Sequence, residues 1–164
     1  MSYWENLDRH EGGACIDDIW LSHPLVRAEV NRRVSGDPAL GPTQWLVTQI
    51  RRPLERAVSI GCGTGAFERD VARRDIVHRV TGVDVAAAPL QRARDLAEAE
   101  GLTARIDYIE SDAIEFLRAN VGKLDAVFFH ASLHHFADPL KMLIFARHAL
   151  KPRAYLYFDE YVGP

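Results

Sequence analysis

Apolar and polar positions follow two different periods along residues 56–160 of the chain. Short apolar runs, typical of buried strands, occupy 57–60, 79–83, 105–109, 124–129 and 154–158. Between them, apolar residues recur every three or four positions, which predicts helices at 67–74, 86–100, 113–119 and 139–150. Because strands that alternate with helices form a parallel sheet covered on both faces, we expect an α/β fold with a doubly wound sheet of about five strands.

The first 54 residues show a purely helical pattern. Ser22-His23-Pro24 is typical of a helix start, and a second helix is expected to begin at Pro42 and to end before Pro53. We interpret residues 1–54 as an N-terminal helical cap on a core of residues 55–164, together forming a single domain of residues 1–164. All three tryptophans lie in the cap, and they are more typical of packing than of a substrate cage.

The overall composition narrows the class of protein. A formal net charge of −3 over 164 residues provides no general attraction to nucleic acid or to an anionic membrane surface. No apolar run approaches the roughly 20 residues that span a bilayer. The only cysteines are Cys15 and Cys62, too few for a disulfide scaffold. We therefore expect a cytoplasmic protein without membrane or nucleic-acid partners.

Residues suited to ligand binding directly follow four of the predicted strands. The turn Gly61-Cys62-Gly63-Thr64-Gly65 follows the first strand and precedes a helix, whose first N–H groups lack partners within the helix. Asp84 and Asp112 follow the second and third strands, and the histidine-containing segment 130–135 follows the fourth. Because the carboxyl ends of parallel strands meet at one rim of the sheet, we expect these residues to line one site.

These motifs, taken in order, resemble those of class I S-adenosylmethionine-dependent methyltransferases. The similarity covers about residues 56–160 and rests on the segments 59–65, Gly82-Val83-Asp84, Glu110-Ser111-Asp112-Ala113, 128–136 and Leu150-Lys151-Pro152. It implies a Rossmann-like fold, the cofactor S-adenosyl-L-methionine and a methyltransferase activity. The residues that it places at the cofactor are Gly61, Cys62, Gly63, Gly65, Asp84, Val85, Asp112, Ala113 and His130.

The resemblance also implies roles for the two carboxylates. Asp84 would accept hydrogen bonds from both ribose hydroxyls. Asp112 would accept one from the adenine amino group, while the Ala113 N–H reads a ring nitrogen. Val85 and Ile114 would provide apolar walls for the adenine. Either carboxylate could instead cap the helix that follows it, and the two roles are compatible.

The three histidines after the fourth strand have more than one interpretation. The resemblance places His130 near the cofactor and His134 or His135 near the methyl acceptor, where either could act as a catalytic base. Methyl transfer depends mainly on in-line positioning, so the base is optional. In the alternative, one of these two histidines packs or caps and the other is solvated. The three histidines do not make a closed ligand set, and no metal site is expected.

The sequence departs from the family pattern at two places. The residue two before the first glycine is usually acidic and is here Ser59, so either cofactor affinity is lower or another residue takes its role. The family sheet usually continues into a sixth and a seventh strand, whereas this sequence ends at Pro164, as a fragment or as a short protein. Either case leaves the fifth strand as an edge, which predicts association into homo-oligomers.

Three functions are compatible with these observations. The favoured one is methyl transfer to a small molecule, since Asn-Pro-Pro-Tyr, a motif of enzymes that methylate nucleobase or amide nitrogens, does not follow the fourth strand. Residues 1–20 are expected to form a lid over this methyl acceptor. A non-catalytic module that binds S-adenosylmethionine or a partner protein is the first alternative. An NAD(P)-dependent oxidoreductase is the second, because Gly61-x-Gly63-x-x-Ala66, with Asp84 about 20 residues on, also fits a dinucleotide site.

Overall fold

The computed structural model describes residues 23–51 and 53–160. The chain forms two units, Met1–Arg51 and Arg52–Pro164, each compact by itself. The first unit contains α1 (Pro24–Ser35) and α2 (Pro42–Gln49), which are the two helices that the sequence predicts. They pack against each other. The expected lid of residues 1–20 lies outside the described residues, and the arrangement of a cap on a core stays a prediction.

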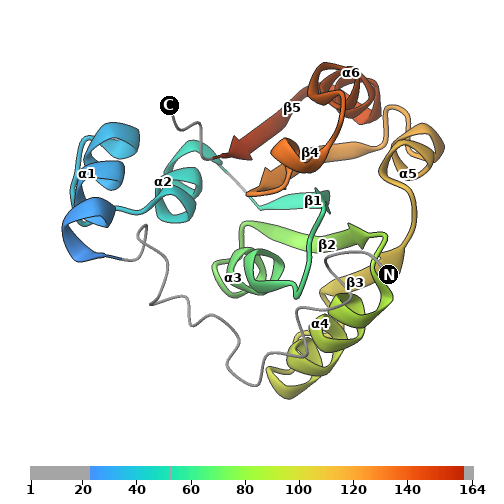
Figure 1. The fold of residues 1–164 in the computed structure, drawn as a ribbon, viewed down its shortest axis with the longest axis horizontal. Coiled ribbons are helices and arrows are strands. Elements are labelled where there is room, and N and C mark those ends of the chain that lie inside the picture. Colours follow the sequence, from blue (N-terminus) through green and yellow to red (C-terminus); the bar gives the residue numbers. More distant parts are fainter. Residues whose placement is uncertain (1–22, 52, 161–164) are drawn as a thin grey trace. The chain divides into compact units, whose positions relative to one another are not determined.

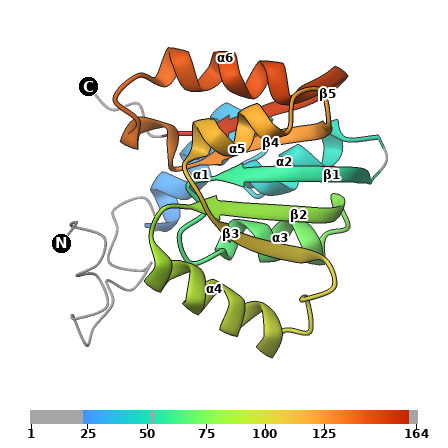
Figure 2. The ribbon, with the colours of Figure 1, turned by 90° about the vertical axis from the view of Figure 1, so that its right-hand side faces the viewer.

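The second unit is built around a parallel sheet of five strands. These are β1 (Leu54–Ile60), β2 (Val77–Asp84), β3 (Ile106–Glu110), β4 (Leu124–His130) and β5 (Leu150–Asp159). They lie in the order β3-β2-β1-β4-β5, and every pairing is parallel (Figure 1, Figure 2). The helices are α3 (Ala66–Arg73), α4 (Ala87–Ala99), α5 (Ala113–Ala119) and α6 (Pro139–Ala149), with a short 3₁₀ turn, η4 (Leu133–His135), after β4. The α/β fold predicted from the sequence is confirmed.

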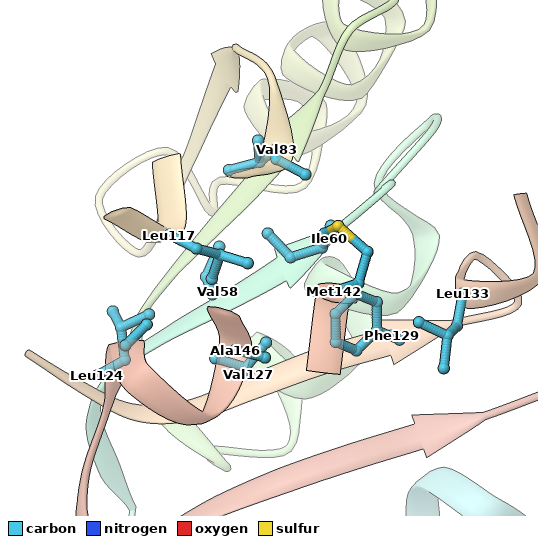
Figure 3. Close-up of a cluster of buried hydrophobic side chains, with 12 residues drawn as sticks. Val58, Ile60, Val83, Leu117, Leu124, Val127, Phe129, Leu133, Met142 and Ala146 are labelled. Carbon is cyan, nitrogen blue, oxygen red and sulfur yellow. The ribbon is translucent and has the colours of Figure 1, made fainter. Parts of the chain in front are cut away.

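The two faces of the sheet are covered by different helices. α5 and α6 cover one face, and the buried cluster there includes Val58, Ile60, Val83, Leu117, Leu124, Val127, Phe129, Leu133, Met142 and Ala146 (Figure 3). α3 lies on the opposite face, where the Phe67 ring packs edge-on against Phe128. Because side chains alternate along a strand, Ser59 points to the α3 face, away from Val58 and Ile60.

The starts of β1 and β5 differ from the sequence prediction by three and four residues, more than those of the other strands. β1 begins at Leu54 rather than at residue 57, because Leu54 already pairs with Val77 of β2. β5 begins at Leu150 rather than at residue 154, although it contains Pro152. Proline is tolerated there because β5 is the last strand of the sheet order, and a register shift against β4 accompanies the positive φ of Arg153, 64°.

Candidate functional site

The turn after β1 contains three glycines with left-handed backbone torsions. Gly61, Gly63 and Gly65 have φ values of 69°, 53° and 73°. A Cβ on Gly61 would lie 2.8 Å from the Ser132 Cβ, and a Cβ on Gly65 would overlap the Tyr108 hydroxyl. A Cβ on Gly63 would meet no described atom within 4 Å. Packing therefore requires glycine at 61 and 65, whereas the space beside Gly63 is open to a ligand.

The Asp84 carboxylate, at the end of β2, holds this turn in place. Its Oδ2 accepts a hydrogen bond from the Gly63 N–H (2.9 Å), and its Oδ1 accepts one from the Ala86 N–H (3.0 Å). The Asp84 carbonyl accepts from the Ser111 N–H (3.0 Å), which joins the end of β3 to the same rim. Asp84 does not cap α4, because the N-cap residue is Ala86 and none of these bonds reaches the first turn of the helix.

Asp112, after β3, does cap the helix that follows it. Its Oδ1 accepts hydrogen bonds from the Ile114 and Glu115 N–H groups at 2.8 and 3.0 Å. Neither bond uses Oδ2, and Asp112 is exposed. Ala113 is the first residue of α5, so its N–H belongs to the helix end that lacks internal partners. Val85, after the adjoining strand, is 70% exposed and presents an apolar surface at the rim.

His130, the last residue of β4, lies against the start of α3. Its ring stacks on the Phe67 ring, with centroids 4.7 Å apart and planes inclined by 16°. Its Nδ1 lies 3.6 Å from Asp159 Oδ2 at the end of β5. The following N–H, of Ala131, donates to the Asp159 carbonyl (2.8 Å). The end of β4 is thereby attached both to α3 and to the end of β5.

Glu160, directly after β5, holds the segment that follows β4. Its Oε1 accepts from the Ser132 and Leu133 N–H groups at 2.8 and 2.6 Å, and its Oε2 lies 2.6 Å from His134 Nδ1. Burial by itself would raise the pKa of the Glu160 carboxyl, but these three contacts outweigh it and hold that pKa below its usual value. The sequence pattern did not single out Glu160, although the signal that located Asp84, a polar residue directly after a strand, applies to it as well.

Ser132 connects the same segment to the glycine turn. Its side chain is buried, and its Oγ donates a hydrogen bond to the Ile60 carbonyl (2.6 Å) at the end of β1. The hydrogen bonds of Ser132, Asp84 and Glu160 thus join the ends of all five strands at one rim. The structure brings Gly61, Gly63, Gly65, Asp84, Asp112 and His130 together there.

His134 and His135 lie side by side in η4, with ring centroids 4.0 Å apart. The His134 side chain is 48% exposed, whereas that of Glu160 is only 8% exposed. Because the ionised Glu160 can only accept, His134 Nδ1 carries the hydrogen, which leaves Nε2 as the nitrogen with the lone pair whenever the ring is neutral. Burial and the adjacent His134 lower the pKa of His135, against the opposing effects of Glu160 and Asp84. His135 is therefore mainly neutral at pH 7 and within electrostatic reach of Asp84.

Cys62 lies in the glycine turn, and its thiol stays protonated at neutral pH. Burial is the main cause, with Glu68 and Asp84 adding to it, of a pKa raised far above the usual value for this thiol. Its Sγ lies 2.9 Å from the place that a Cβ on Gly82 would take, so the side chain packs against β2. A ligand in the turn would therefore meet the Cys62 backbone.

Two kinds of site are not found in the part of the chain that the structure describes. No group of three or more His, Cys, Asp and Glu side chains is arranged to hold a metal ion. No described helix has both the length and the apolar character needed to cross a membrane.

A parallel five-stranded sheet with a glycine turn and acidic strand ends at one rim is consistent with the Rossmann-like fold of class I S-adenosylmethionine-dependent methyltransferases. Residues 58–158 match the family described as a methyltransferase domain, and the chain belongs to this family. S-adenosyl-L-methionine is the cofactor that this membership implies.

Individual relatives agree with this class. The chain is similar to the ubiquinone biosynthesis O-methyltransferase of Histophilus somni (strain 2336), with 34% identity over 127 residues that cover 73% of the chain and 52% of the relative. The protein of the same name from Pasteurella multocida (strain Pm70) is 31% identical over 114 residues, which cover 64% and 46%. The solved structure of the cyclase SpnF matches with a TM-score of 0.63 and 29% identity over 70% of the chain and 42% of that protein. The chain spans about half the length of the curated relatives it matches.

Proposed function

We propose that this chain binds S-adenosyl-L-methionine at the rim of its sheet and transfers the methyl group to an oxygen atom of a small molecule. The observation that carries this proposal is the convergence of the strand ends, in which the Asp84 carboxylate holds the glycine turn through the Gly63 N–H. Family membership supports the cofactor, and the names of the curated relatives support an oxygen as the methyl acceptor.

The residues at the rim fit the chemistry of this cofactor. The Asp84 oxygens each accept one backbone hydrogen bond and keep a lone pair for a ribose hydroxyl. Asp112 keeps Oδ2 for the adenine amino group, and Val85 offers an apolar surface to the ring. The open space beside Gly63 suits the amino-acid part of the cofactor, whose backbone-like groups can approach a glycine closely.

The pair of His134 and Glu160 supports proton removal from a hydroxyl acceptor. The bound cofactor supplies a methyl group on an electrophilic sulfonium centre. We assign His134 Nε2 as the group that receives the proton of the acceptor hydroxyl. Glu160 holds Nδ1 of the same ring, which fixes the tautomer and stabilises the imidazolium that forms. His135 is assigned to the wall of the site as a neutral ring.

Calorimetric titration tests the cofactor part of the proposal. S-adenosyl-L-methionine and its demethylated product, S-adenosyl-L-homocysteine, are expected to bind the wild-type chain, and NAD is not. Asp84→Ala is expected to weaken binding at least about tenfold, because it removes charged acceptors for the ribose hydroxyls. The control is Asp107→Ala, since Asp107 is an exposed carboxylate on β3 that pairs with Arg79. Binding of NAD alone would favour the oxidoreductase.

Release of S-adenosyl-L-homocysteine in the presence of a panel of small phenols tests the reaction. His134→Gln is expected to lower kcat about a hundredfold with an unchanged Kd for the cofactor. The control is His148→Gln, at an exposed position of α6. The relative SpnF is a cyclase by name, so membership of the fold does not by itself establish turnover. Cofactor binding without transfer to any phenol would favour the non-catalytic module.

A further inference from the structure

Glu68 is a buried carboxylate that the function proposed above does not use. It lies in the first turn of α3, directly after the glycine turn, and its exposed fraction is 0%. Neither Oε1 nor Oε2 accepts a hydrogen bond of good geometry from any described residue, although the Ser59 hydroxyl lies near enough to favour the charged form. An unpaired carboxylate in this position is unfavourable unless a proton or a cation compensates for it, because burial removes the water that would solvate its charge.

The protein itself supplies no cation that bonds to Glu68 within the described residues. Arg69 is adjacent in sequence, but its guanidinium donates to Glu100 Oε1 (2.9 Å) and to the Thr64 carbonyl (2.7 Å). The charged and titratable groups that face Glu68 are Asp84 from β2, Tyr108 from β3, Cys62 from the glycine turn and Arg69 from α3, and Arg94 of α4 donates to the Tyr108 carbonyl. Glu68 and Asp84 both lie close enough to Cys62 of the glycine turn to raise the pKa of its thiol.

Ser59 is the second observation that points to this carboxylate. It is 1% exposed, it lies on the face of β1 that α3 covers, and its hydroxyl favours the charged form of Glu68. The family that the sequence resembles usually carries an acid at the Ser59 position. In this chain the strand carries a small hydroxyl instead, and the carboxylate beside it comes from the helix. The carboxylate beside Ser59 therefore comes from α3 rather than from β1.

We propose that Glu68 is the anion that stabilises the positive charge of S-adenosyl-L-methionine, so that the chain prefers this cation to S-adenosyl-L-homocysteine, whose sulfur is uncharged. This inference rests on the function proposed above, because it requires the cofactor at the glycine turn. Since Glu68 has no exposed surface, it acts through its electric field rather than by contact, and the low local polarity strengthens that effect. It is a positioning residue and takes no part in the transfer itself.

The preference depends on pH. Burial raises the pKa of the Glu68 carboxyl to about 7, against the opposing effects of the Ser59 hydroxyl, the Glu68 N–H and Arg69, while Asp84 adds to the rise. Below that pH the ligand-free protein carries a neutral Glu68, which attracts a cation weakly; above it, Glu68 is ionised. A bound cation favours the ionised form, so binding of S-adenosyl-L-methionine near pH 7 releases a proton from Glu68.

The test measures Kd for both ligands by calorimetry on the full chain at pH 6, 7 and 8. If ionised Glu68 favours the cation about tenfold, the ratio of the two Kd values changes about fivefold in favour of the cation between pH 6 and pH 8. The ratio is expected to stay constant in Glu68→Gln, and this comparison cancels the ionisation of the ligands themselves. The matched control is Glu115→Gln, at the equivalent first-turn position of α5, where the side chain is exposed.

Two further measurements guard against a misfolded variant. The double variant Ser59→Glu/Glu68→Ser moves the carboxylate to β1 and is expected to regain the preference for the cation. Thermal unfolding of Glu68→Gln tests burial directly. The folded-state pKa of Glu68 lies above its ordinary value of 4.5, so its contribution to stability is present below about pH 4.5 and is lost as the pH rises through 7. Glu68→Gln is therefore expected to raise Tm relative to wild type more at pH 8 than at pH 5.

The outcomes separate the two proposals. An equal pH dependence of the Kd ratio in wild type and in Glu68→Gln would overturn the role of Glu68 and leave the proposed function intact. Failure of both ligands to bind the wild-type chain would overturn the proposed function and this inference together.

Discussion

The glycine turn shows how single residues can serve folding and binding separately. Gly65→Ala is expected to destabilise the protein by about 3 kcal/mol, because the strain of a positive φ adds to an overlap with Tyr108. Gly63→Ala should cost only about 1 kcal/mol, since its φ is also positive but no described atom lies near the new Cβ. Denaturant unfolding measures both changes.

For cofactor binding, in contrast to stability, Gly63 is expected to matter more than Gly65. Gly63→Ala should lower cofactor affinity at least about tenfold, because the added methyl group occupies space assigned to the ligand. Gly101→Ala is the matched control: Gly101 has φ 68° and open space around its Cα, but it lies after α4 and away from the rim. Equal affinities for Gly63→Ala and Gly101→Ala would show that the turn does not contact the cofactor.

The residues of the site differ in how far the sequence could locate them. Asp84 and Asp112 could be found because each lies within two residues of the end of a strand, and the topology of a parallel sheet brings such positions together. The link between Glu160 and His134 could not, because it depends on how β5 ends beside η4. Glu68 could have been noticed from the sequence for a different reason. It lies on the same face of α3 as Phe67 and Val71, both buried, so a charge stands within the apolar stripe.

At the scale of helices and strands, the sequence predicts best where burial is regular. β4 is packed on both faces, so its apolar run marks it clearly. The start of β5 could not be predicted, because Pro152 normally excludes a strand interior and the residues around it have no apolar period. The structure accommodates these residues through irregular pairing with β4. This pairing is possible because β5 is the last strand of the sheet, which the local sequence does not indicate.

The start of α5 gives a test in which cap and ligand roles separate. Asp112→Asn should leave stability within about 0.5 kcal/mol, because an amide oxygen can accept the Ile114 and Glu115 N–H bonds as Oδ1 does. It should lower cofactor affinity about tenfold, since an amide NH₂ in place of Oδ2 cannot accept from the adenine amino group. Thermal unfolding and calorimetry measure the two effects.

The control for this change lies on another helix. Asp138 caps α6 by accepting from the Lys141 N–H (2.9 Å), so Asp138→Asn repeats the substitution in a cap that has no assigned ligand role. It should change neither stability nor affinity appreciably. Unchanged affinity in Asp112→Asn as well would restrict Asp112 to capping.

At the scale of the whole molecule, the order of the strands makes β5 the last one in the described sheet. Parallel pairing with β4 satisfies one side of β5, and a strand in this position offers its other backbone groups to a further strand. Its apolar residues Leu156 and Phe158 are 38% and 55% exposed. The aligned residues cover only about half of the curated relatives, so a further segment of a longer protein and a second copy of the chain are both suitable partners for this edge.

For the 164-residue chain alone, we expect association through β5 at micromolar concentration. Phe158→Lys should shift the equilibrium toward the monomer, because a charge on an edge strand opposes pairing between strands. Leu140→Lys is the matched control, since Leu140 is an apolar side chain of α6 that is 69% exposed and lies on no strand. Sedimentation velocity across a concentration series distinguishes the species. A wild-type chain that stays monomeric throughout would mean that the polar ends of β5 and its irregular start already prevent strand pairing.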